Sequence, residues 1–94
     1  DAKLEGRIVA TRVPGIAEGL RRQLVGFVQG LRGLDLKKKP SVSETLDWCR
    51  TLLALGITGS ASGSIDKGAL RSTLGVVLKH QVDIETAAAA LGLS

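Results

Sequence analysis

The stretch from Pro40 to Trp48 most constrains the fold, because it combines a specific helix start with the only tryptophan of the chain. Ser41 is suited to cap the first turn of a helix, and Glu44, three residues later, is suited to bind back to the Ser41 amide. This Ser-x-x-Glu pattern is a capping box, and Pro40 lies just outside it. We therefore expect a helix that begins at Val42.

Apolar residues follow this start at helical spacing. Steps of three and four residues place them on one face of an α-helix over residues 42–55. The predicted buried face consists of Val42, Leu46, Cys49, Leu53 and Gly56, with Leu52 beside it. Leu46 is accordingly predicted to lie in the core.

The composition favours helices over sheets. The 94 residues are 44% hydrophobic, but Phe27 and Trp48 are the only aromatic residues. Burial must therefore come from Leu, Val, Ile and Ala, which suit interdigitated helices. The sequence predicts an all-α protein, a small bundle of four to five helices that forms a single domain over residues 1–94.

The remaining helices are predicted from apolar periodicity and from Asp, Gly and Pro signals. They are residues 2–12, a helix from Gly15 to Gly33, a helix capped by Asp66 that buries Leu70, Leu74, Val77 and Leu78, and a helix from about Asp83 to Gly92. The first helix starts abruptly and without a predicted cap, which indicates a fragment of a longer chain. Residues 57–64 are rich in Gly and Ser and are predicted to form a flexible surface loop.

The sequence contains few groups that could catalyse a reaction. Cys49 is single, so it cannot form an internal disulfide, and it is predicted to be a small buried residue without a metal. His80 has no nucleophile in a recognisable setting. No phosphate loop of the type Gly-x-x-x-x-Gly-Lys-Ser/Thr is present. We expect no catalytic residue and no metal ligand in these residues.

The charge pattern leaves the choice of partner open. A net charge of +4 is compatible with a nucleotide or nucleic acid, but solubility alone explains it, and the run Lys37-Lys38-Lys39 is most simply a solvated loop. Residues 53–58 resemble the turn of a helix-turn-helix, but the following Gly, Ser and Ala residues cannot read bases. Nucleic-acid binding is therefore not favoured. Because no apolar run approaches the roughly 20 residues of a membrane span and no signal peptide is evident, we expect a cytoplasmic protein.

Five segments in order resemble the C-terminal helical lid of MoxR-type AAA+ ATPases. They are Arg12-Val13-Pro14-Gly15-Ile16, residues 23–28 (QLVGFV), residues 34–40 (LDLKKKP), residues 43–48 (SETLDW) and residues 73–80 (TLGVVLKH). The resemblance extends over nearly the whole chain, although no single segment is as specific as a phosphate loop.

The resemblance implies a lid that closes over ATP and Mg²⁺ held by a nucleotide-binding core that would precede residue 1. It also implies neighbouring subunits in a ring, often hexameric, chaperone-like remodelling or maturation of metal centres, and a partner with a von Willebrand factor A domain. Many related lids carry a sensor arginine near the start of the helix that corresponds to residues 42–55, where this sequence has Ser43 and Glu44. The resemblance therefore places Ser43, Glu44 and Lys39 near the nucleotide. A free-standing helical interaction module and a basic nucleic-acid binder are the alternatives.

Overall fold

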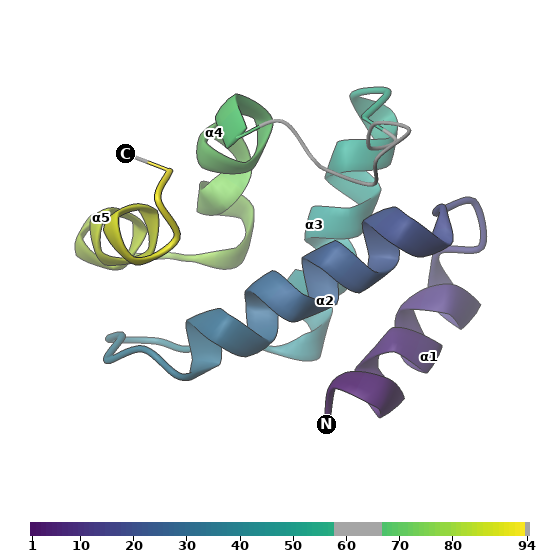
Figure 1. The fold of residues 1–94 in the computed structure, drawn as a ribbon, viewed down its shortest axis with the longest axis horizontal. Helices are drawn as coiled ribbons and strands as arrows, with labels where there is room; N and C mark the ends of the chain where they lie inside the picture. Colours follow the sequence, from purple (N-terminus) through teal and green to yellow (C-terminus); the bar gives the residue numbers. More distant parts are fainter. Residues whose placement is uncertain (58–66, 94) are drawn as a thin grey trace.

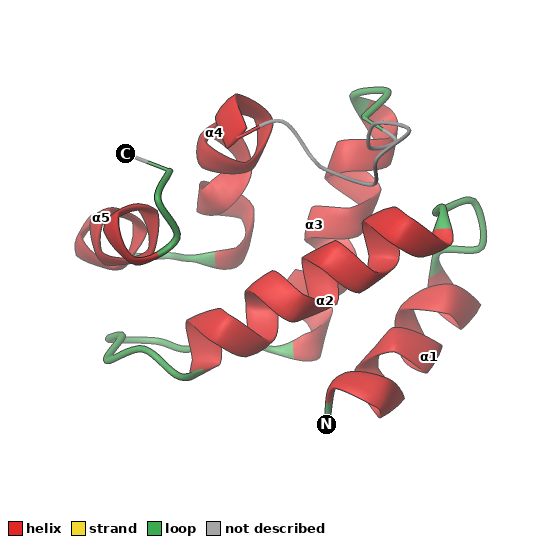
Figure 2. Cartoon of the chain, viewed as in Figure 1, coloured by secondary structure: helices red, strands yellow, loops and turns green. Residues whose placement is uncertain are grey.

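The computed structural model describes residues 1–57 and 67–93, and the described residues form five helices and no strand (Figures 1 and 2). The helices are α1 (Ala2–Arg12), α2 (Glu18–Arg32), α3 (Val42–Ala54), α4 (Lys67–Val77) and α5 (Gln81–Ala90). This architecture confirms the prediction of a small all-α bundle. Residues 58–64 of the predicted Gly/Ser-rich loop and the Asp66 cap lie outside the described residues.

Helix α1 has the cap that the sequence analysis did not predict. The carboxylate of Asp1 accepts a hydrogen bond from the Leu4 amide at 2.8 Å, so it satisfies one of the free N–H groups of the first turn. The helix ends at Arg12, two residues before Pro14, as the sequence predicts.

Helix α2 begins at Glu18, three residues later than Gly15, where the sequence placed it. The residues between the helices form a turn in which the Ile16 amide donates to the Val13 carbonyl at 3.1 Å. Ala17 is extended, with φ −68° and ψ 146°, and serves as the N-cap. Because of this turn, α2 begins later than predicted. The end of α2 at Gly33 agrees with the prediction.

Helix α3 has the predicted bounds to within one residue. Ser41 is its N-cap, and its hydroxyl accepts a hydrogen bond from the Glu44 amide at 3.4 Å. At the other end Gly56 has φ +76°, a conformation that favours glycine. The Ile57 amide donates to the Leu52 carbonyl at 2.9 Å, which closes a Schellman motif.

The buried face of α3 differs from the prediction by roughly a quarter of a helical turn. Its fully buried residues are Thr45, Trp48, Cys49 and Leu52, whereas Leu46 is only partly buried against the core. The reason is tertiary, since α1, α2 and α4 all contact this helix and together decide which face is enclosed.

Trp48 is the largest of the fully buried side chains among the described residues. Its indole nitrogen donates to the Thr73 hydroxyl oxygen at 2.7 Å, so the polar edge of the ring is satisfied inside the core. The predicted apolar face of α4 is confirmed by the burial of Leu70, Leu74, Val77 and Leu78. In Figure 1, α2 crosses in front of α3, while α1 and α5 lie on opposite sides of the view.

Helix α5 begins at Gln81, earlier than the predicted Asp83. Its end agrees with the prediction, because Gly92 has φ +69° and the Leu93 amide donates to the Ala88 carbonyl at 2.8 Å. None of the described helices is both long enough and apolar enough to cross a membrane.

Two leucines of α3 provide a matched test of this packing. Leu52→Ala removes a fully buried side chain and is expected to lower the free energy of unfolding by about 2–5 kcal/mol. Leu46→Ala removes a partly buried one and is expected to cost roughly 1 kcal/mol. Urea denaturation of both variants measures the difference, and a larger loss for Leu46→Ala would place the face where the sequence predicted it.

Candidate functional site

The candidate site is the segment that leads into α3. We call residues 37–44, which contain the three lysines, Pro40 and the first turn of α3, the basic corner. Its backbone is held from two directions, by Arg32 at the end of α2 and by Asp83 in α5. The geometry of these two anchors decides what the corner presents to solvent.

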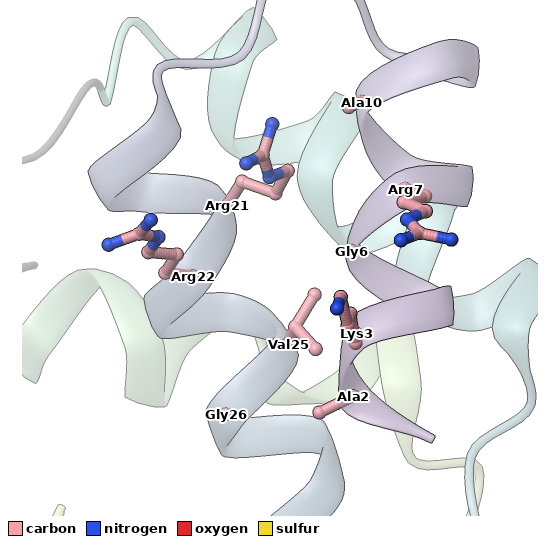
Figure 3. Close-up of a pocket in the computed structure, with 9 residues that line it drawn as sticks. All are labelled: Ala2, Lys3, Gly6, Arg7, Ala10, Arg21, Arg22, Val25 and Gly26. Atoms are coloured by element: carbon pink, nitrogen blue, oxygen red, sulfur yellow. The ribbon is translucent and has the colours of Figure 1, made fainter.

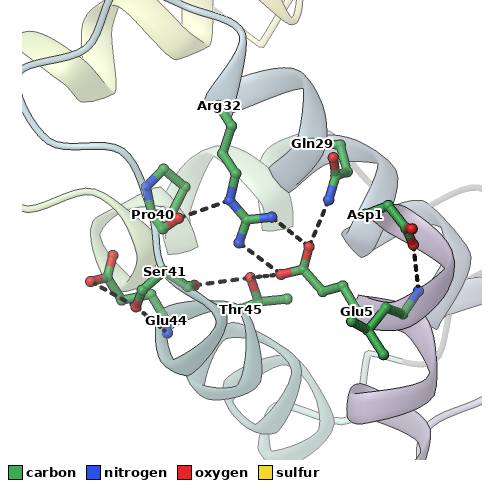
Figure 4. A network of polar contacts seen from close by, with 9 residues as sticks. Asp1, Glu5, Gln29, Arg32, Pro40, Ser41, Glu44 and Thr45 are labelled. Carbon is green, nitrogen blue, oxygen red and sulfur yellow. Dashed lines mark hydrogen bonds and ion pairs between the residues drawn. The ribbon is translucent and has the colours of Figure 1, made fainter.

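The first anchor begins with a buried carboxylate. Glu5 of α1 is only 3% exposed, and its two oxygens accept hydrogen bonds from three side chains (Figure 4). The guanidinium of Arg32 donates to both oxygens, with its Nη2 atom 2.8 Å from Oε2. The Gln29 amide donates to Oε1 at 2.8 Å, and the Thr45 hydroxyl donates to Oε2 at 2.9 Å. One carboxylate thus connects α1, α2 and α3.

Arg32 extends this connection to the basic corner. Its remaining nitrogen, Nε, donates to the Pro40 carbonyl at 2.9 Å while the two terminal nitrogens hold Glu5. A guanidinium presents its N–H groups in a rigid planar fork, so the position of Glu5 also fixes the position of the Pro40 carbonyl. The N-terminal end of α3 is therefore positioned by a residue of α1.

The environment of Glu5 favours its charged form. Burial by itself raises the pKa of the Glu5 carboxyl, but the hydrogen bonds from Arg32, Thr45 and Gln29 outweigh burial. The net pKa of Glu5 lies below its ordinary value of 4.5. The carboxylate is thus ionised at neutral pH even though it is almost fully enclosed.

The second anchor is Asp83, and here the structure corrects the sequence analysis. Asp83 was predicted to start the last helix, but it lies inside α5 and is only 2% exposed. Its carboxylate accepts hydrogen bonds from the backbone amides of Lys37 at 2.9 Å and Lys38 at 3.1 Å. The lysine backbone is therefore fixed, although the side chains of Lys37, Lys38 and Lys39 are exposed.

Glu44 forms only half of the predicted capping box. The Ser41 hydroxyl accepts from the Glu44 amide and donates to the Glu44 Oε1 at 3.3 Å, but no hydrogen bond joins the Glu44 carboxylate to the Ser41 amide within the described residues. The side chain is 13% exposed, and Oε1 lies 3.9 Å from the Lys38 ammonium. Oε2 is buried and makes no hydrogen bond there.

The predicted nucleotide-side residues are not joined to one another. Lys39 and Ser43 are exposed, whereas Glu44 is turned toward Ser41 and Lys38. No hydrogen bond or ion pair links Lys39, Ser43 and Glu44 in the described part of the chain. Lys38, which the sequence analysis did not single out, is the lysine nearest Glu44.

The basic corner can attract an anion. Three lysines project beside the N-terminal end of α3, where the helix dipole is also positive. Cys49 is buried as predicted, and burial raises the pKa of its thiol to about 11. Among the described residues, no cluster of His, Cys, Asp and Glu side chains could hold a metal ion.

Comparison with known proteins gives no assignment. No family model matches the chain, and searches of curated proteins and of solved structures give no significant match. The resemblance to the AAA+ lid therefore rests on the sequence segments alone.

The buried state of Glu5 predicts a specific pH dependence. A carboxyl with a lowered folded pKa stabilises the fold above its unfolded pKa, and this stabilisation is lost as the pH falls below 4.5 through the folded value. Glu5→Gln is therefore expected to reduce the fall in the free energy of unfolding at acidic pH, measured by urea denaturation across pH. The matched control is Glu18→Gln at an exposed position, which should leave this fall as steep as in the unchanged protein. An unchanged fall in Glu5→Gln would contradict this role.

Proposed function

We propose that the chain is the C-terminal helical lid of a MoxR-type AAA+ ATPase, acting in the cytoplasm. The proposal rests on the five ordered segments that resemble this lid, and the single structural observation that supports it most is the doubly anchored basic corner. In this proposal the lid presents positive charge toward a nucleotide from a fixed position. Asp83 holds the backbone amides of Lys37 and Lys38, and Arg32 holds the Pro40 carbonyl that follows the lysines.

In this proposal Lys39 and Ser43 lie on the nucleotide side. Both side chains are exposed, and the ammonium of Lys39 could neutralise phosphate charge while the Ser43 hydroxyl offers a hydrogen bond. ATP and Mg²⁺ would be held by the phosphate loop of the core, because these residues contain no such loop. The role of the lid is then to complete the site rather than to catalyse.

Glu44 has a structural role in this proposal. A carboxylate aimed at a triphosphate would repel it by about 1 kcal/mol or more even with water screening. The contacts of Glu44 with Ser41 and Lys38 keep the charge away from the exposed side of the corner. Lys38 partly balances the charge that would otherwise oppose nucleotide binding.

Motion of such a lid would be that of a rigid body. Glu5, Arg32 and Thr45 bind α1, α2 and α3 together, so a displacement at the basic corner must move α1 as well. In a ring of subunits this coupling would carry nucleotide state to the neighbouring subunit. Chaperone-like remodelling, metal-centre maturation and a von Willebrand factor A domain partner follow from the resemblance alone.

The test is ATP turnover by the product of the complete reading frame. We expect a phosphate loop encoded upstream of Asp1, ATP hydrolysis by the complete product, and none by residues 1–94 alone. Glu44→Gln should leave turnover nearly unchanged, since the amide oxygen of Gln can still accept from Ser41. Glu44→Arg is expected to change ATP affinity, because it restores the residue type common in related lids.

Two results would contradict the proposal. A reading frame that starts close to Asp1, with no phosphate loop, would remove the core that the lid requires. A large rise in turnover with Glu44→Gln would show that Glu44 acts on the phosphates instead of stabilising the start of α3.

A further inference from the structure

A basic groove lies between α1 and α2, on a part of the surface that does not include the basic corner (Figure 3). Its volume is about 470 Å³, within the usual range of ligand sites. Small residues line it, including Ala2, Gly6 and Gly26, beside the buried Val25. The polar residues that line it are all basic, namely Lys3 and Arg7 on α1 and Arg21 and Arg22 on α2.

The charges on the two rims of the groove are not equally satisfied. On the α2 rim, Glu18 lies 2.7 Å from Arg22 and 3.9 Å from Arg21. On the α1 rim, Lys3 and Arg7 have no ion-pair partner among the described residues, and both are exposed. The α1 rim thus has two cations that are available to an acidic ligand.

We propose that this groove binds an acidic, amphipathic segment of a protein partner. Carboxylates of the segment pair with Lys3 and Arg7 on one rim and compete with Glu18 for Arg22 on the other. Small apolar side chains of the segment lie on the floor, where Gly6 and Gly26 let a backbone approach closely. A Cβ atom built on either glycine would meet no atom within 4 Å, so this space is open.

The chemistry of the groove favours a peptide over a nucleic acid or nucleotide. Proteins that bind single strands stack bases on aromatic side chains, and no residue lining the groove is aromatic. The floor is apolar, and a phosphate backbone would bury nothing against it. A peptide with carboxylates flanking a Leu or Ala matches both the rims and the floor.

This inference does not depend on the proposed function, because it uses no residue of the basic corner. A lid and a free-standing interaction module could both use such a surface. Its failure would leave the ATPase proposal untouched, and the reverse also holds.

The test measures binding of a fluorescent acidic peptide to residues 1–94 by anisotropy. The probe is an amidated peptide of about 12 residues, a little over three helical turns, with repeating Glu, Ala and Leu. Lys3→Glu/Arg7→Glu is expected to weaken binding at least about tenfold, the equivalent of roughly 1.4 kcal/mol. The matched control is Arg50→Glu/Lys79→Glu, which changes the net charge equally at exposed positions outside the groove.

A second pair of variants tests the floor without changing charge. Gly26→Leu fills the groove, whereas Gly75→Leu adds the same side chain to an exposed, open position on α4. Both replacements raise helix propensity, so both variants should fold, as circular dichroism can verify. Only Gly26→Leu is expected to abolish peptide binding.

Three outcomes would overturn the proposal. Equal loss of affinity in the two charge-reversed variants would show an unspecific attraction to net charge. Equal binding by Gly26→Leu and Gly75→Leu would show that the floor is not occupied. Tighter binding of a single-stranded oligonucleotide than of the peptide, lost in Lys3→Glu/Arg7→Glu, would assign the groove to nucleic acid.

Discussion

Ionised Glu5 is costly to bury, and the arrangement of three helices follows from how that cost is offset. A carboxylate removed from water is tolerated only when its oxygens are paired and hydrogen-bonded. Here the donors come from Arg32 and Gln29 in α2 and from Thr45 in α3, so the carboxylate can be satisfied only when these helices are assembled. Removing one partner would leave an uncompensated charge inside the bundle.

The two faces of α1 serve different purposes. The inner face carries Glu5, which through Arg32 positions the Pro40 carbonyl and hence the start of α3. The outer face carries Lys3 and Arg7, which are exposed beside the groove against α2. An occupant of the groove would therefore contact the same helix that holds the basic corner in place. The fold thus gives the two surfaces a shared rigid support, whatever partners they bind.

The sequence predicts what is local in this fold and misses what is long-range. The Ser41 cap depends on neighbours within a turn and is confirmed, and the end of this helix was predicted to within one residue. The prediction that Leu46 is a core residue was wrong, because Leu46 is only partly buried. Contacts with three other helices decide which face of α3 is enclosed.

Asp83 and Glu5 were missed as anchors, since their partners lie 46 and 27 residues away in the sequence and no periodic pattern marks such pairs. The sequence could place the predicted nucleotide-side residues Lys39, Ser43 and Glu44 in one short segment. It could not predict the directions in which their side chains point.

A double-mutant cycle between Glu5 and Arg32 tests most directly whether this pair organises the bundle. Glu5→Leu and Arg32→Met should each lower the free energy of unfolding by roughly 2–4 kcal/mol, somewhat below fully enclosed pairs because Arg32 is 26% exposed. The double variant should lose much less than the sum, with a coupling of at least about 1.5 kcal/mol, because no unpaired charge remains. Losses that add to within about 0.5 kcal/mol would contradict the account.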